Sequence, residues 1–195
     1  MMFSAVRRFA ALAFVALAAT ACDTPPIRAF PDVTFADQTP IRLDVAQVEV
    51  VQSYQPTMEP PQVEHLFPQT PSEAMRRWVE ERLQPVGTSG VARVYIENAS
   101  VRSEALARTP GFRGTFTIDQ SERLTADLAM RLEIQKPGGS GYAVASAQRS
   151  ITVPENATLA EREDIWFRLT ESTMNDLDTR MELSIRTNLV RFVGG

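Results

Sequence analysis

The chain has 195 residues, of which 44% are hydrophobic, and a formal net charge of −4. This acidic balance argues against nucleic-acid binding, which requires a basic surface that releases counterions. The chain holds one histidine, His65, and one cysteine, so these residue types cannot form a transition-metal site by themselves.

The first 21 residues have the organisation of a secretory leader. Arg7 and Arg8 precede an uncharged run of 13 residues, 9–21, which is shorter than the roughly 20 residues that a helix needs to cross a bilayer. The run ends in the small residues Ala-Thr-Ala, directly before Cys22. We therefore predict that residues 1–21 are a cleaved lipoprotein signal peptide. Its removal lowers the 20 basic residues to 18 against 24 acidic ones, a net charge of −6.

Cys22 follows a sequence that resembles a lipobox, the motif that precedes a lipid-modified cysteine. Ala19 occupies the position, three residues before the cysteine, where leucine is more usual. Lipidation with several acyl chains, palmitate among them, would anchor the protein stably in a membrane. The alternative, an ordinary secreted protein, leaves an unpaired thiol in an oxidising compartment. We therefore predict a lipid-anchored protein of the bacterial cell envelope that faces the periplasm. Asp23, the residue after the cysteine, resembles the signal that keeps enteric lipoproteins on the inner membrane. Because this rule does not hold across all bacteria, the choice between inner and outer membrane stays open.

A tether and a single domain are predicted to follow. Residues 22–39 are rich in proline and are expected to be extended rather than packed, and the domain covers residues 40–193. Its first strand spans 41–52, where the apolar alternation changes parity between Val45 and Val48. This change predicts either a bulge or a strand that is buried on both faces. Residues 54–71 contain five prolines and no period, which predicts a long surface loop.

Two helices are predicted from capping boxes that precede apolar stripes. The first helix begins after Thr70 and extends to about Gln84; its stripe is Met75, Trp78, Val79 and Leu83. The second begins after Thr158 and continues for about 30 residues; its stripe is Met174, Leu177, Met181, Ile185, Leu189 and Phe192.

Four stretches between the helices predict strands. Residues 91–101 change parity near Glu97 and Asn98, 112–118 form a short strand or the arm of a hairpin, 123–135 alternate over six apolar positions, and 142–153 place three alanines on one side. Strands joined by turns indicate an antiparallel sheet. We predict an α+β fold, a two-layer sandwich of about four antiparallel strands with both helices on one face, in the order β-α-β-β-β-α.

No catalytic motif or phosphate-binding loop occurs in the sequence, so we predict no enzymatic activity, no cofactor and no metal. Two segments are candidate contacts for a protein partner. Val63, Leu66 and Phe67 lie in the proline-rich loop, where they meet a partner or pack back on the helix that contains Trp78. Phe112 and Phe116 lie in the possible hairpin, where they meet a partner or face the core.

The lipobox at Cys22, the proline-rich tether and the β-α-β-β-β-α order together resemble small bacterial envelope lipoproteins. These include the auxiliary lipoproteins of ABC-type lipid transport systems and the LptE-like plug proteins of lipopolysaccharide export. The resemblance implies a non-enzymatic accessory or assembly subunit of an envelope transport complex. Two other functions stay open: a binding protein for a lipid or another small apolar ligand, lined by Met130, Met174 and Met181, and a structural component of the cell wall or of a secretion system.

Overall fold

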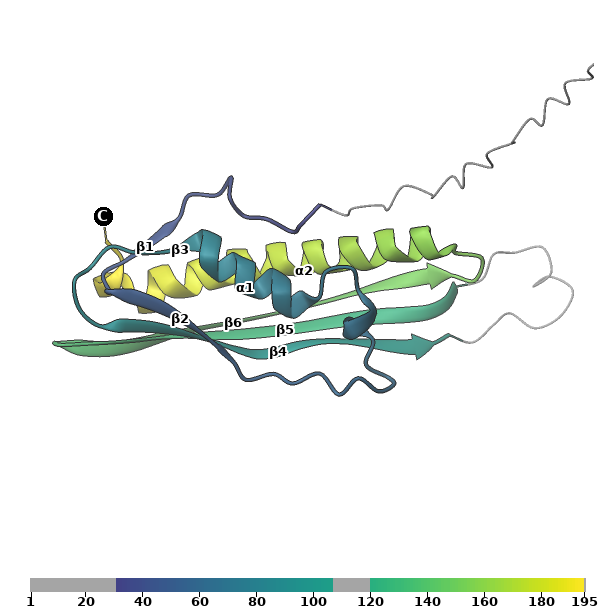
Figure 1. The fold of residues 1–195 in the computed structure, drawn as a ribbon, viewed down its shortest axis with the longest axis horizontal. Helices are drawn as coiled ribbons and strands as arrows, with labels where there is room; N and C mark the ends of the chain where they lie inside the picture. Colours follow the sequence, from purple (N-terminus) through teal and green to yellow (C-terminus); the bar gives the residue numbers. More distant parts are fainter. Residues whose placement is uncertain (1–30, 107–119, 195) are drawn as a thin grey trace, which may run out of the picture.

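The computed structural model describes residues 31–106 and 120–194. In chain order the elements are β1 (Ile41–Leu43), β2 (Gln47–Gln52), η1 (Glu64–Leu66), α1 (Pro71–Arg82), β3 (Leu83–Pro85), β4 (Val91–Ala105), β5 (Gln120–Lys136), β6 (Gly139–Pro154), α2 (Leu159–Asn188) and η3 (Val190–Phe192). A four-stranded sheet has the order β2-β4-β5-β6, and β1 and β3 form a second, two-stranded sheet. Both helices cover the same face of the larger sheet (Figure 1), which confirms the predicted two-layer α+β fold.

The most periodic segments form the elements predicted for them. All six apolar positions of β5 from Leu124 to Ile134 are at most 1% exposed. The parity change near Glu97 is a β-bulge in β4, and both helices begin with their capping boxes, at Thr70 and Thr158. The predicted strand 112–118 lies outside the described residues.

The larger sheet departs from the predicted antiparallel arrangement at one edge. β2 pairs with β4 in parallel, because the chain crosses from one strand to the other through α1. β1 pairs with β3 instead, so the single strand predicted over 41–52 is two strands in two sheets. α1 ends at Arg82, earlier than predicted, because Leu83 is already extended and begins β3.

α2 and the sheet enclose the main core. The stripe of α2 and η3 from Met174 to Phe192 is at most 4% exposed. A Cβ atom on Gly141 would lie 2.7 Å from Leu189 Cδ2, so a larger residue there would displace this leucine. Met130, Met174 and Met181 are each at most 1% exposed within the same core, which favours ordinary packing over a ligand lining. Over the described ranges, neither helix has the length and apolar character that a bilayer crossing demands.

A second apolar cluster occupies the end of the sandwich where β4 finishes and α2 begins. It consists of Phe67, Val101, Leu124, Ala126, Val153, Ile165, Trp166 and Leu169. Phe67 comes from the proline-rich loop, whereas the other members come from the sheet and α2. This end of the body therefore depends on a loop residue to complete its packing.

Residues 32–39, which we call the strap, correct the prediction of an unpacked tether. Val33 and Phe35 are each 3% exposed and belong to the main core. Their alternation with exposed neighbours is the pattern of a half-buried extended segment, but it is only two apolar residues long. The folded body therefore begins before residue 40 and includes the strap.

Candidate partner-contact site

The proline-rich loop, residues 53–69, runs from β2 to α1 and lies along the outer edge of β4. The amides of Ser53 and Tyr54 both donate to the Ile96 carbonyl. Further along, the Val63 amide donates to the Val101 carbonyl and the Ser103 amide donates to the Pro61 carbonyl, both at 2.9 Å. The loop thus covers part of a strand edge that β2 is too short to reach, and an exposed edge would otherwise pair with other chains.

The opposite edge of the sheet is covered by α2 and η3. Ser184 Oγ accepts a hydrogen bond from the Val144 amide, and Arg180 and Arg191 donate to the carbonyls of Ser146 and Ser140. These side chains come from regular helical elements, whereas β4 is covered by irregular chain. The loop is therefore the less regular of the two edge covers.

Glu64 fixes the loop to the sheet. Its side chain is 3% exposed; Oε1 accepts a hydrogen bond from the Tyr54 hydroxyl at 2.5 Å, and Oε2 accepts one from the Val101 amide at 3.1 Å. Burial raises the pKa of the Tyr54 phenol, and the hydrogen bond to Glu64 and the charge of that carboxylate raise it further. The Val101 amide belongs to β4 and Tyr54 lies at the start of the loop, so Glu64 ties the middle of the loop both to the sheet and to the loop's own first residues. Because a buried carboxylate is costly to leave unpaired, the two donors hold the loop at a defined position.

Phe67 is the second attachment of the loop. Its ring is 5% exposed and stacks on Trp166 of α2, with centroids 5.1 Å apart and planes 9° apart. The prediction that the loop packs back is thus right for Phe67, but its partner is α2 rather than the helix containing Trp78. Val63 is half-buried, and Leu66 is 54% exposed. Phe112 and Phe116, like Cys22, lie outside the described residues.

A hollow of about 290 Å³ opens beside the loop. It is lined from both sides, by Tyr54, Pro56, Met58 and His65 of the loop and by Ser72 and Arg76 of α1 among others. Met58 is 60% exposed. Met58 and Leu66 therefore present apolar surface on a segment that Glu64 and Phe67 hold in place.

Buried nitrogen atoms without a hydrogen-bond partner are found around the loop and the strap. Within the described ranges they are His65 Nδ1 on the loop, Trp166 Nε1 beneath Phe67, and Arg77 Nε beside the strap. Buried polar atoms are normally paired, so each exception calls for an explanation.

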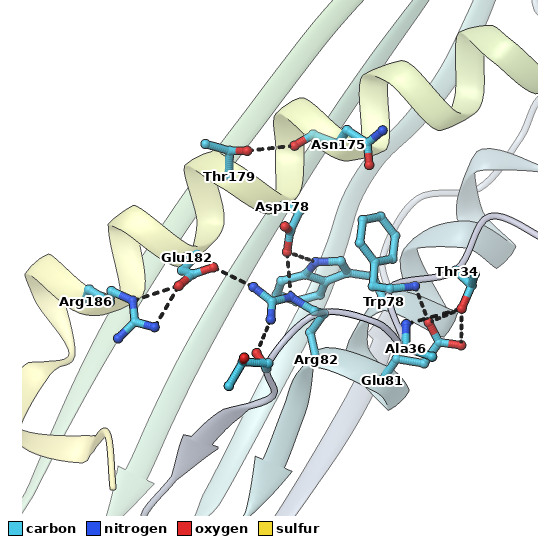
Figure 2. A network of polar contacts seen from close by, with 12 residues as sticks. Thr34, Ala36, Trp78, Glu81, Arg82, Asn175, Asp178, Thr179, Glu182 and Arg186 are labelled. Carbon is cyan, nitrogen blue, oxygen red and sulfur yellow. Dashed lines mark hydrogen bonds and ion pairs between the residues drawn. The ribbon is translucent and has the colours of Figure 1, made fainter. Parts of the chain in front are cut away.

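Arg82 joins the strap to both helices. The side chain is 1% exposed, and its Nε donates to Asp178 at 2.7 Å while Nη2 donates to Glu182 at 2.5 Å. Nη1 donates to the Thr39 carbonyl at the end of the strap, and Trp78 Nε1 shares the Asp178 carboxylate. Figure 2 shows this network between α1, α2 and the strap. Position 82 follows residues 75, 78 and 79 at helical spacing, a signal that would have placed this arginine inside.

The strap has its own contacts with α1. Thr34 Oγ1 and the Phe35 amide donate to the Glu81 carboxylate, as Figure 2 shows at its right side for Thr34 and Glu81. Asp32 forms an ion pair with Arg77 at 2.8 Å. The strap is therefore fixed at both ends of its length, near Asp32 and near Thr39.

No protein-family model matches this chain, and no curated protein sequence matches it. Among solved structures it is similar to the rare lipoprotein B of Shewanella oneidensis, with 13% identity and a TM-score of 0.39; the match covers 72% of this chain and 95% of that protein. It is also similar to a Xanthomonas campestris protein of the DUF330 family, with 10% identity and a TM-score of 0.30, over 75% and 85% of the two chains. Similarities this low transfer no function.

The described residues contain no group of three or more His, Cys, Asp or Glu side chains placed to hold a metal ion. The loop instead exposes the apolar side chains of Met58 and Leu66 on a fixed segment beside a hollow. Such an arrangement suits recognition of a protein surface.

Proposed function

We propose that this chain is a lipid-anchored protein of the bacterial cell envelope that acts as a non-enzymatic accessory subunit of an envelope transport complex. The acceptor of the anchor is Cys22, at the end of the leader. The surface that meets the partner is the proline-rich loop, with Leu66 and Met58 as the exposed apolar contacts.

The observation that carries the proposal is the pinning of the loop by Glu64. A buried carboxylate is an expensive way to stabilise a surface segment, and an apolar residue would serve packing better. It does give the loop one fixed position, which lowers the entropy lost when the loop binds. Leu66, two residues after Glu64, is thereby held outward.

The anchor contributes by position. Acyl chains at Cys22 would confine the body to one membrane surface, which raises its effective concentration toward neighbours on that surface. A weak contact through Met58 and Leu66 is then sufficient for occupancy. Catalytic groups are not needed for such a role.

The anchor is tested by metabolic labelling with radioactive palmitate. We expect label on the wild-type protein and none on Cys22→Ala, with the protein shifted from the membrane to the soluble fraction. Cys22→Ala that still carries label, or wild type that carries none, would remove the anchor from the proposal.

The contact is tested by a photo-crosslinking residue placed at Leu66. Val190, which is 69% exposed at the other end of the body, is the matched control. We expect a discrete adduct with an envelope protein from position 66 and not from position 190, and Glu64→Ala should weaken the adduct because the loop loses its attachment. Equal adducts from both positions, or none, would contradict the assignment of the loop.

A further inference from the structure

The length of chain between the anchor and the folded body is set by the strap. If the strap were free, the body would begin at β1, 19 residues beyond Cys22. Because Asp32 is held by Arg77 and Val33 is buried, only ten residues separate Cys22 from the first fixed residue. Ten residues reach at most about 35 Å, against about 65 Å for 19.

The strap also touches the end of the proline-rich loop. The Val33 amide donates to Gln69 Oε1 at 2.8 Å, and Asp32 lines the same hollow as Pro68 and Gln69. Leu66 is three residues from Gln69, which adds about 10 Å. The exposed part of the loop therefore lies within roughly 45 to 50 Å of the acylated cysteine, plus the length of one side chain.

The charge of the loop argues against the bilayer itself as its target. Residues 53–69 contain no lysine or arginine, and of their two glutamates Glu64 is buried, which leaves Glu59 as the exposed charge of this segment. Glu59 is exposed next to Met58. Surfaces that bind anionic lipid headgroups are basic, so an acidic loop with isolated apolar residues fits a protein surface with apolar and basic groups.

We infer that the strap holds the proline-rich loop close to the membrane, where the loop meets the periplasm-facing surface of an integral membrane protein in the same bilayer as the anchor. This inference rests on the proposed function, since it takes the anchor at Cys22 as given. It adds the class of partner and gives the strap a role in positioning. The partner presents apolar and basic groups within the short reach of the tether.

The experiment uses the full acylated chain in cells, with the photo-crosslinking residue at Leu66 and a tether of changed length. An insert of about 20 Gly and Ser residues between Cys22 and Asp32 triples the tether. Effective concentration falls as about the −3/2 power of tether length, so we expect the adduct to fall about fivefold. Releasing the strap needs Glu81→Ala combined with Val33→Ser and Phe35→Ser, which removes the carboxylate that accepts from Thr34 and the Phe35 amide together with the two buried side chains. This variant should lower the adduct about twofold to threefold by the same relation.

The matched control carries the same insert at Gly138, in the β5–β6 turn, where an added Cβ atom meets no atom within 4 Å. This insert leaves the tether unchanged, so the adduct should stay at its wild-type level. Mass spectrometry of the adduct should identify a partner that has membrane-spanning segments.

Three results would overturn the inference. A soluble or wall-bound partner would place the contact away from the bilayer, an adduct with lipid would make the bilayer the target, and a yield that does not fall when the tether is lengthened would deny the strap its role. In the first and third cases palmitate labelling and a protein adduct from position 66 would still support the anchored, partner-binding protein, whereas a lipid adduct would also contradict the proposed protein contact. Loss of both would instead remove the proposed function, and the inference with it.

Discussion

Among the residues that the structure describes, two charged side chains are almost fully withdrawn from solvent, and they are held in different ways. Arg82, at 1% exposure, meets two carboxylates from α2 and a strap carbonyl. Glu64, at 3% exposure, meets a phenol hydroxyl and a backbone amide. Arg82 is thus matched by opposite charge within the body, whereas Glu64 is held by uncharged donors at its edge.

The difference separates stability from position. Arg82 ties together α1, α2 and the strap, so its loss affects the packing of every layer on the helical side. Glu64 ties one loop to one strand, so its loss should release that loop while the sandwich persists. Substitution of Arg82 should therefore lower the stability of the whole body, whereas substitution of Glu64 should free only the loop.

The largest effect is expected for Arg82→Met. Removing the guanidinium leaves Asp178, which is 13% exposed, and Glu182 without their shared cation. Breaking a buried ion pair from one side typically costs about 3 to 5 kcal/mol, and we expect a loss of that size in the free energy of unfolding. Urea denaturation of the chain lacking residues 1–22 measures it.

Arg186→Met is the control for this variant. Arg186 also pairs with Glu182, at 2.7 Å, but it is 58% exposed, and exposed pairs on one helix contribute only about 0.5 kcal/mol. If both variants lost the same free energy of unfolding, the buried ion pairs of Arg82 would contribute no more than an exposed pair. The proposed difference between Arg82 and Glu64 would then be wrong.

Sequence patterns predicted the long regular elements and failed for the short ones. The period of two in β5 and the period of 3.6 in α2 extend over many positions, and they predicted both elements. The change of parity near Glu97 predicted the bulge in β4. The burial of the strap was not predicted, because its alternating pattern has only two apolar residues, Val33 and Phe35. The parallel pairing of β2 was missed although the predicted order already placed a helix between the strands 41–52 and 91–101, which is the connection that parallel strands need; the turns between the later strands were extended to the whole sheet.

The candidate site was predictable only in outline. Prolines identified the loop, and its apolar residues were identified as either packed or exposed. Which of them packs was decided by tertiary contacts: Phe67 reaches Trp166, about 100 residues away in sequence, while its neighbour Leu66 points out. Glu64 had no signal at all, since an acidic residue in a polar loop normally lies in solvent.

The second prediction compares these two neighbours. Phe67→Ala removes a buried ring from the cluster around Trp166, and we expect a loss of about 3 kcal/mol in the free energy of unfolding. Leu66→Ala should change it by no more than about 0.5 kcal/mol, because the side chain is 54% exposed. Urea denaturation followed by tryptophan fluorescence measures both, since Trp166 loses its stacked partner only in the first variant. A larger loss for Leu66 would reverse the assignment of packing and contact.

The smallest effect concerns the phenol that holds Glu64. Tyr54→Phe removes one hydrogen bond to a carboxylate, which costs about 1.5 kcal/mol at neutral pH. Burial, with the bond and the charge of Glu64, raises the pKa of Tyr54 in the folded protein above its ordinary value of 10.0. The unfolded chain therefore releases this proton first, so the stability linked to Tyr54 is complete below about pH 10 and declines as the pH rises above it.

Tyr54→Phe should abolish that decline, and the ultraviolet difference between wild type and variant should place the tyrosinate transition of Tyr54 above its ordinary pKa. Glu64→Gln is the comparison variant: it removes the carboxylate charge and, with one acceptor oxygen, keeps a hydrogen bond from either Tyr54 or the Val101 amide but not from both. Loss of the charge should lower the pKa of Tyr54 toward its ordinary value. If Tyr54 titrated at its ordinary pKa in the wild type, the loop would not be pinned as described. Glu64 would then be an ordinary surface carboxylate, and within residues 31–106 and 120–194 Arg82 alone would remain as a charge that the fold has to enclose.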